Sequence, residues 1–248
     1  MAIETVKAFG TKFVLASGQA FALEAYKNSL SVYGYAEIAL SYKDDGGATL
    51  VRLVSQLGSA HTHDQSGRQV WDVKFDQSVD QQLGTRSHTL REFSMHTDAS
   101  FEVPPPQYVA LGVVQEDRLG GGITQLLDGK NLHSSLSDES KETLRRSLFT
   151  VAVPLEFRRS KDDSFVRVPL LDQHGNFRFR HELLDLESLN AQQLKAVKEL
   201  QELLTNEHWA ISLPLPQGTI LLIDNGRMFH ARTRVLDKER HLLRMRFH

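Results

Sequence analysis

One segment in the last third of the chain is the most informative: Thr219-Ile220-Leu221-Leu222-Ile223-Asp224-Asn225-Gly226-Arg227-Met228-Phe229-His230. Its first five residues are apolar or β-branched and follow a Pro-x-Gly turn at 216–218, which is typical of a buried strand. A polar turn comes next, and the segment ends on His230. A histidine a few residues beyond a buried strand can point into the mouth of a barrel. Taken alone, His230 is more simply explained as a hydrogen-bonded core or surface histidine.

Similar short strands are predicted along most of the chain. They are rich in β-branched, aromatic or leucine residues, and glycine-containing turns separate several of them. The predicted strands are residues 35–40, 70–75, 108–115, 123–127, 149–155, 165–169, 210–213, 219–224 and 242–247. From residue 93 onward these strands do not alternate regularly with helices, which argues against a parallel doubly wound sheet. We therefore expect a mainly β fold, an antiparallel sandwich or jelly roll with flanking helices.

Three segments have the apolar spacing of amphipathic helices. They are residues 19–32, the region of residues 50–57, and residues 189–205, for which Asn190 is the candidate N-cap. A shorter helix is expected to begin near Ser137, because two acidic residues follow it in what would be the first turn.

The composition restricts the class of protein. The 248 residues include 29 Lys+Arg and 31 Asp+Glu, so no overall positive charge favours nucleic acid or an anionic membrane. Cysteine is absent, which excludes disulfides, thiolate metal sites and cysteine nucleophiles and agrees with a reducing compartment. No apolar run approaches the roughly 20 residues of a membrane helix, and residues 1–7 lack the layout of a signal peptide. We expect one cytoplasmic domain over residues 1–248, whose oligomeric state the sequence does not define.

The triplet His96-Thr97-Asp98 places a histidine and a carboxylate two residues apart. In an extended strand, side chains at i and i+2 point to the same face, so His96 and Asp98 can reach one ion together. The triplet alone is weak evidence, because roughly one or two such triplets are expected by chance in a chain of this composition. With His230 it forms a set of two imidazoles and one carboxylate. This set suits Fe(II) and leaves coordination positions open for a bidentate cosubstrate and oxygen.

A basic segment lies near the end of the chain: Arg240-His241-Leu242-Leu243-Arg244-Met245-Arg246. On a strand, Arg240, Arg244 and Arg246 share one face. An arginine on the inner face of a barrel is costly unless an anion meets it, and a guanidinium binds a carboxylate through two hydrogen bonds. The alternative is a basic edge strand that faces solvent.

Taken in order, four motifs resemble those of the Fe(II)/2-oxoglutarate-dependent dioxygenases, and more narrowly those of the taurine dioxygenase and clavaminate synthase-like branch. They are His96-x-Asp98, Gly121-Gly122-Ile123-Thr124, Asp224-Asn225-x-Arg227-x-x-His230 and Arg240-x-x-x-Arg244. The resemblance covers residues 91–248 and is fainter over residues 26–58. Gly226 departs from the family, in which a larger residue is common at this position.

The resemblance implies a double-stranded β-helix, a cupin-like jelly roll with iron at its mouth. His96, Asp98 and His230 match the metal ligands, and Thr124 and Arg240 match the residues that hold the far carboxylate of 2-oxoglutarate. The implied enzyme uses Fe(II), 2-oxoglutarate and O2, releases succinate and CO2, and hydroxylates, desaturates or cyclises its substrate. Related halogenases lack the metal-binding carboxylate, so the presence of Asp98 argues against halogenation.

The implied substrate is a small, amino-acid-like molecule, because the clavaminate synthase-like branch often acts on such compounds. Arg244 matches a second arginine of the family, near the keto-acid end of the cosubstrate or the anionic group of the substrate. Arg158 is another candidate to meet a carboxylate, although a solvated charge run explains it more simply. Glu92 and Phe101 flank the His96-x-Asp98 motif and are further candidates for substrate contact.

Two other functions stay open on the sequence. A zinc-dependent hydrolase could use the same three side chains, but it leaves Arg240 and Thr124 unexplained. A non-catalytic jelly-roll binding protein predicts no stoichiometric Fe(II) binding. His61 and His63 raise the question of a second metal site, for which a pair of polar loop histidines is the simpler explanation.

Overall fold

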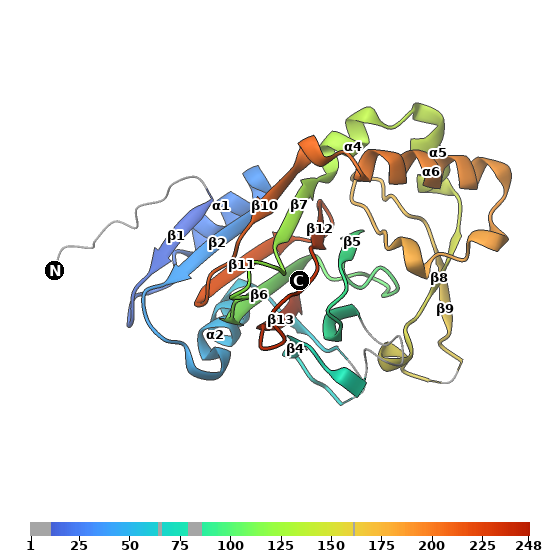
Figure 1. Cartoon of the computed structure of the whole chain (residues 1–248). Coiled ribbons are helices and arrows are strands. Elements are labelled where there is room, and N and C mark those ends of the chain that lie inside the picture. Colours follow the sequence, from blue (N-terminus) through green and yellow to red (C-terminus); the bar gives the residue numbers. More distant parts are fainter. Residues whose placement is uncertain (1–10, 64–65, 79–85, 161) are drawn as a thin grey trace.

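The computed structural model describes residues 11–63, 66–78, 86–160 and 162–248, and strands dominate it (Figure 1). The expectation about a signal peptide concerns residues 1–7, which lie outside these ranges. The strands are β1 (Lys12–Leu15), β2 (Tyr35–Leu40), β3 (Ala60–His61), β4 (Trp71–Lys74), β5 (Phe93–His96), β6 (Tyr108–Gln115), β7 (Thr124–Asp128), β8 (Phe149–Ala152), β9 (Phe165–Val168), β10 (Ala210–Leu213), β11 (Thr219–Asp224), β12 (Met228–Arg232) and β13 (His241–Phe247).

The helices lie outside the sheets. The α-helices are α1 (Leu23–Tyr33), α2 (Ala48–Leu57), α4 (Gly129–Ser135), α5 (Asp138–Arg146) and α6 (Ala191–Leu204). Short 3-10 turns are η1 (Asp45–Gly47), η2 (Arg86–His88), η3 (Leu155–Phe157), η4 (His181–Leu183), η5 (Leu186–Ser188) and η6 (Glu207–Trp209). Within the described ranges, no helix is both long and apolar enough to cross a membrane.

Two sheets face each other and form the core. The larger has the order β1-β2-β11-β6-β13-β3, with β4 also paired to β13, and the smaller has the order β10-β7-β12-β5. Apolar side chains from both sheets meet in one buried cluster: Val109, Leu221 and Ile223 from the larger sheet with Leu126, Leu213 and Met228 from the smaller. This arrangement of mostly antiparallel strands confirms the predicted jelly roll.

Strand β13 separates two environments. Leu243, Met245 and Phe247 pack in the cluster that contains buried residues of α1 and α2, so these helices cover the outer face of the larger sheet (Figure 1). Leu242 belongs instead to another buried cluster and lines the same cavity as His96 and His230. Because side chains alternate along a strand, Arg244 and Arg246 lie on the inner face with Leu242, as the sequence predicted.

The chain between β7 and β10 forms an addition beside the jelly roll. Helices α5 and α6 lie side by side there, and β8 pairs with β9 (Figure 1). Leu144 of α5, Leu200 of α6 and Phe149 of β8 are fully buried in one cluster with core residues of β7 and β12. The addition is therefore packed firmly against the sheet that carries the candidate site.

The predicted elements differ from the structure mainly at their ends. Helix α1 begins at Leu23 rather than at residue 19, because Gln19 closes a turn on Ala16 through its backbone and its side chain. Strand β8 stops at Ala152 and leads through Pro154 into η3, whereas the prediction extended it to residue 155. Asn190 caps α6 through a capping box, as expected. Ser137 caps α5 by accepting a hydrogen bond from the amide of Ser140.

Candidate metal centre and cosubstrate pocket

Two neighbouring strands of the smaller sheet bring the candidate ligands together. β5 and β12 are antiparallel, and His230 lies directly opposite His96 in their register. Side chains at directly opposed positions lie on the same face of a sheet, and the two imidazole rings are 4.3 Å apart. Asp98 follows two residues beyond the end of β5.

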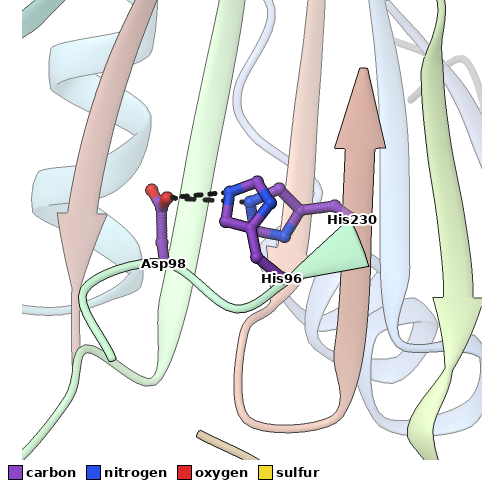
Figure 2. Close-up of side chains that lie close together, drawn as sticks. All are labelled: His96, Asp98 and His230. Carbon is purple, nitrogen blue, oxygen red and sulfur yellow. Dashed lines mark ion pairs between the residues drawn. The ribbon is translucent and has the colours of Figure 1, made fainter. Parts of the chain in front are cut away.

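The three side chains point toward one another (Figure 2). The Nε2 atoms of His96 and His230 lie 3.6 Å and 3.7 Å from Asp98 Oδ1. All three residues are buried, and one ligand atom from each lies within 4.8 Å of the others. Ligands at about 2.0–2.2 Å from a shared ion lie roughly 3–4 Å apart, so the donor set fits a divalent metal such as Fe(II).

The ionisation of these groups favours metal binding. His96 donates Nδ1–H to the carbonyl of Ser94 at 2.8 Å, which leaves the Nε2 lone pair toward Asp98. Burial, together with the nearby His230 ring, lowers the pKa of His96 to about 4, so the ring is neutral at pH 7. Burial alone would raise the pKa of Asp98. The positive charge of Arg244, together with the two adjacent histidines, outweighs this effect and holds the pKa of that carboxyl well below its usual range.

Asn225 fixes the backbone of Asp98 from a distant part of the chain. Its side-chain oxygen accepts from the Asp98 amide at 2.7 Å, and its side-chain amide donates to the carbonyls of Asp98 and Pro106. The sequence contained Asn225 within a motif but gave no sign of this bridge, because the partners are 127 residues apart.

The same loop is held from the addition between β7 and β10. The Thr97 amide donates to the Phe179 carbonyl at 2.8 Å, and the Phe179 amide donates to Thr97 Oγ1 at 2.9 Å. Phe93 stacks on the His96 ring at 3.7 Å, and the Arg180 guanidinium lies over the Phe93 ring. Phe93, Phe179 and Arg180 therefore support the candidate ligands, and sequence reasoning assigned a role to none of them.

A small cavity of about 60 Å³ opens beside the triad, and three arginines line it together with one carboxylate, Asp98. The arginines are Arg232, Arg240 and Arg244, and the other lining residues include His96, His230 and Thr124. The structure therefore brings together every residue predicted for the metal and the cosubstrate.

Arg240 is buried in this cavity and donates to the carbonyl of Gly122 at 3.2 Å. Burial lowers the pKa of its guanidinium to about 10, so it remains charged at neutral pH. Within the described residues it forms no ion pair. Gly122 has φ +60°, and a Cβ there would lie 2.5 Å from Arg240 Nε. The glycine of this motif thus makes room for the guanidinium.

Arg244 and Arg246 continue along the inner face of β13. Arg244 lies 3.0 Å from Asp98 Oδ2, whereas Arg246 donates to Glu102 at 2.7 Å. Glu102 also pairs with His61 at 3.1 Å. A second cavity, of about 210 Å³, lies at this end and is lined by Glu102, His61, His63 and several apolar side chains.

The residues predicted to contact substrate separate into two groups. Phe101 is buried, stacks on Phe157 and lines the second cavity, and Arg244 lines the first. Glu92 is exposed and lines neither cavity. Arg158 also lines neither, and its Nε donates to the carbonyl of Val153.

Within the described residues, the triad is the only cluster of three or more potential metal ligands, and His61 and His63 belong to no such cluster. His63 is buried, and its Nε2 lies 3.3 Å from the carbonyl of Arg244. Burial, with Arg244 and Arg246, lowers the pKa of His63 to about 2.

Comparison with known proteins agrees with this geometry. The model of the family described as "Taurine catabolism dioxygenase TauD, TfdA family" matches residues 44–246. The chain belongs to this family. The TauD/TfdA assignment confirms the resemblance drawn from the four motifs, and a family of dioxygenases favours neither a zinc hydrolase nor a non-catalytic binding protein.

Solved structures similar to this TauD/TfdA chain show the same fold. One is an asparagine oxygenase in complex with Fe(II), 3-hydroxyasparagine and succinate, with 18% identity, a TM-score of 0.71, and coverage of 91% of this chain and 82% of that chain. Another is the non-heme iron oxygenase OrfP in complex with Fe and alpha-ketoglutaric acid, with 19% identity, a TM-score of 0.68, and coverage of 88% and 75%. No curated protein matches the chain.

Proposed function

We propose that this protein is an Fe(II)- and 2-oxoglutarate-dependent oxygenase that hydroxylates, desaturates or cyclises a small, amino-acid-like substrate. The observation that carries the proposal is the convergence of two imidazoles and one carboxylate beside a buried arginine that has no ion pair among the described residues. A zinc hydrolase would need the three ligands but not a buried cation for a dicarboxylate.

In this proposal His96, Asp98 and His230 would hold Fe(II), which would supply the redox chemistry by which O2 oxidises 2-oxoglutarate to succinate and CO2 and oxidises the substrate. Arg240 and Thr124 bind the far carboxylate of the cosubstrate. The Ser94 carbonyl keeps the proton of His96 on Nδ1, so Nε2 stays free for the metal. Phe93 covers the His96 ring and helps to exclude water.

The order of arginines along β13 supports a substrate position on the opposite side from the cosubstrate. Arg240 immediately precedes the strand, and Arg244 forms an ion pair with Asp98. Arg246 is the next residue on the inner face and lies beside the second cavity. Arg244 is the candidate partner for a substrate carboxylate. Phe101 and Phe157 form an apolar floor in the second cavity, which suits the rest of an amino-acid-like molecule.

The names of the similar structures agree with this substrate class. The asparagine oxygenase is bound to 3-hydroxyasparagine, and OrfP occurs in complex with (3S)-hydroxy-L-Arg. In the present chain the charged groups Glu102 and Arg246 already pair with each other. We therefore propose an amino acid or derivative whose side chain need not be charged.

The direct test is anaerobic titration of the protein with Fe(II) and then 2-oxoglutarate. We expect the weak visible charge-transfer band of the iron chelate. In air, we expect succinate release that becomes faster when an amino acid that serves as substrate is added. His230→Ala should weaken Fe(II) binding at least about a hundredfold. The exposed His208 offers a control, and His208→Ala should behave like the parent protein. Absence of the band in the parent protein would refute the proposed function.

A further inference from the structure

Arg232 occupies a position next to the proposed cosubstrate site. It lies on β12 two residues after His230, so both side chains are on the same face of the sheet. In the register between β12 and β7 it is directly opposite Thr124. Because directly opposed side chains are near neighbours, Arg232 lies beside the hydroxyl proposed to hold the far carboxylate. It also lines the cavity that contains Arg240.

The hydrogen bonds of Arg232 do not neutralise it. Its Nη2 donates to the carbonyls of Thr89, at 3.0 Å, and Arg91 in the segment before β5, with a longer contact to Arg86. Carbonyl oxygens are neutral, so they satisfy donors without cancelling the charge. Its Nε has no hydrogen-bond partner, and no carboxylate pairs with the guanidinium, in the part of the chain that the structure describes.

The charges that line the cavity are therefore unbalanced. Three guanidiniums face it, and its one carboxylate, Asp98, pairs with Arg244. Among the described residues neither Arg232 nor Arg240 forms an ion pair, and the Asp117 carboxylate acts on Arg240 only from beyond ion-pair distance. A buried cation is costly unless an anion compensates it, so the pair forms a site suited to an anion from outside the protein.

We propose that Arg232 is a second guanidinium for the far carboxylate of the 2-oxo acid, acting together with Arg240 and Thr124. This inference rests on the proposed function and extends it. The bonds from Nη2 to the segment before β5 hold the guanidinium in place, while the remaining N–H groups are available to the carboxylate. The site then selects 2-oxo acids with a second carboxylate over those that end in a methyl group.

The test compares Arg232→Gln and Arg232→Lys with the parent protein, titrated anaerobically with Fe(II) and then with 2-oxoglutarate or 2-oxopentanoate. The second probe has the same five carbons but lacks the far carboxylate. We expect Arg232→Gln to bind 2-oxoglutarate about ten- to a hundredfold more weakly, with unchanged affinity for Fe(II) and for 2-oxopentanoate. Arg232→Lys keeps the charge and should recover part of the loss.

Arg227 provides a matched control. It also donates to backbone carbonyls, those of Ser31 and Val32, but it is paired with Asp128 and lines neither cavity. Arg227→Gln should lower the melting temperature and leave the preference for 2-oxoglutarate unchanged. Unchanged 2-oxoglutarate affinity in Arg232→Gln, or a parallel loss of Fe(II) affinity, would refute the proposal and show that the role of Arg232 is structural. A parent protein without the chelate band would instead refute the proposed function itself.

Discussion

The two ends of the inner face at β13 use the same residue type in opposite ways. At the cosubstrate end, Arg240 is buried, forms no ion pair among the described residues and donates a hydrogen bond to the carbonyl of Gly122. At the far end, Arg246 is still more deeply buried, with 2% of its side chain exposed, but it is paired with Glu102. A buried arginine with an internal carboxylate is part of the structure, whereas one without such a partner indicates a place for an anionic ligand.

Breaking the pair at the far end should have the largest effect on stability. Arg246→Met leaves the Glu102 carboxylate with His61 as its remaining partner, and we expect a loss of about 3 kcal/mol in the free energy of unfolding. Chemical denaturation measures this loss. The double variant Arg246→Met/Glu102→Leu removes both charges and should regain most of it. Equal stability of Arg246→Met and the parent protein would contradict a structural role for the pair.

The corresponding change at the cosubstrate end should act on binding instead. Arg240→Met removes a buried cation that forms no ion pair among the described residues, so the unfolding free energy should stay constant or rise slightly. Affinity for 2-oxoglutarate should fall about ten- to a hundredfold, because a charge-assisted hydrogen-bond pair is lost. Titration of the iron chelate band measures the affinity. If Arg240→Met unfolded readily but bound 2-oxoglutarate normally, Arg240 would be a structural residue and not a ligand-binding one.

A smaller effect is expected from pH at the far end. The folded pKa of His63, about 2, lies below the unfolded value of about 6.5, so the unfolded chain takes up the proton first as pH falls. Stability from the neutral ring is complete above pH 6.5 and is lost below it, by up to about 2 kcal/mol at pH 5. His63→Phe should flatten the decline in unfolding free energy between these pH values, and His208→Ala should not. The same slope in parent and His63→Phe would show that the buried ring does not resist protonation.

The sequence predicted the parts of the molecule that depend on local pattern. Strand β11 and the inward arginines of β13 follow from apolar alternation, and the cap at Asn190 follows from local side-chain chemistry. The strands that carry the histidines were missed because His96, His230 and Arg232 break the apolar pattern of β5 and β12. Functional residues obscure the periodicity of the elements that position them.

Residue type and order were sufficient to nominate the triad, Thr124 and Arg240, through their resemblance to a family. The supporting contacts were not predictable in the same way. Asn225 and Phe179 act on the His96-x-Asp98 loop through hydrogen bonds across many intervening residues, and no local signal reports such partners. Arg232 could have been placed on the same face as His230 only if residues 228–232 had been predicted as a strand, because side chains two positions apart on a strand share a face.

The Asn225 bridge also affects how a newly made chain reaches its working form. Asp98 leaves the ribosome long before the amide that fixes its backbone, since 127 positions separate the two partners. Until the C-terminal strands have been synthesised and have packed, His96 and Asp98 lack both the Asn225 hydrogen bonds and the neighbouring His230. Under the proposed function, iron binding therefore has to follow synthesis of the C-terminal strands, and a polypeptide that ends before them would lack the third ligand, His230.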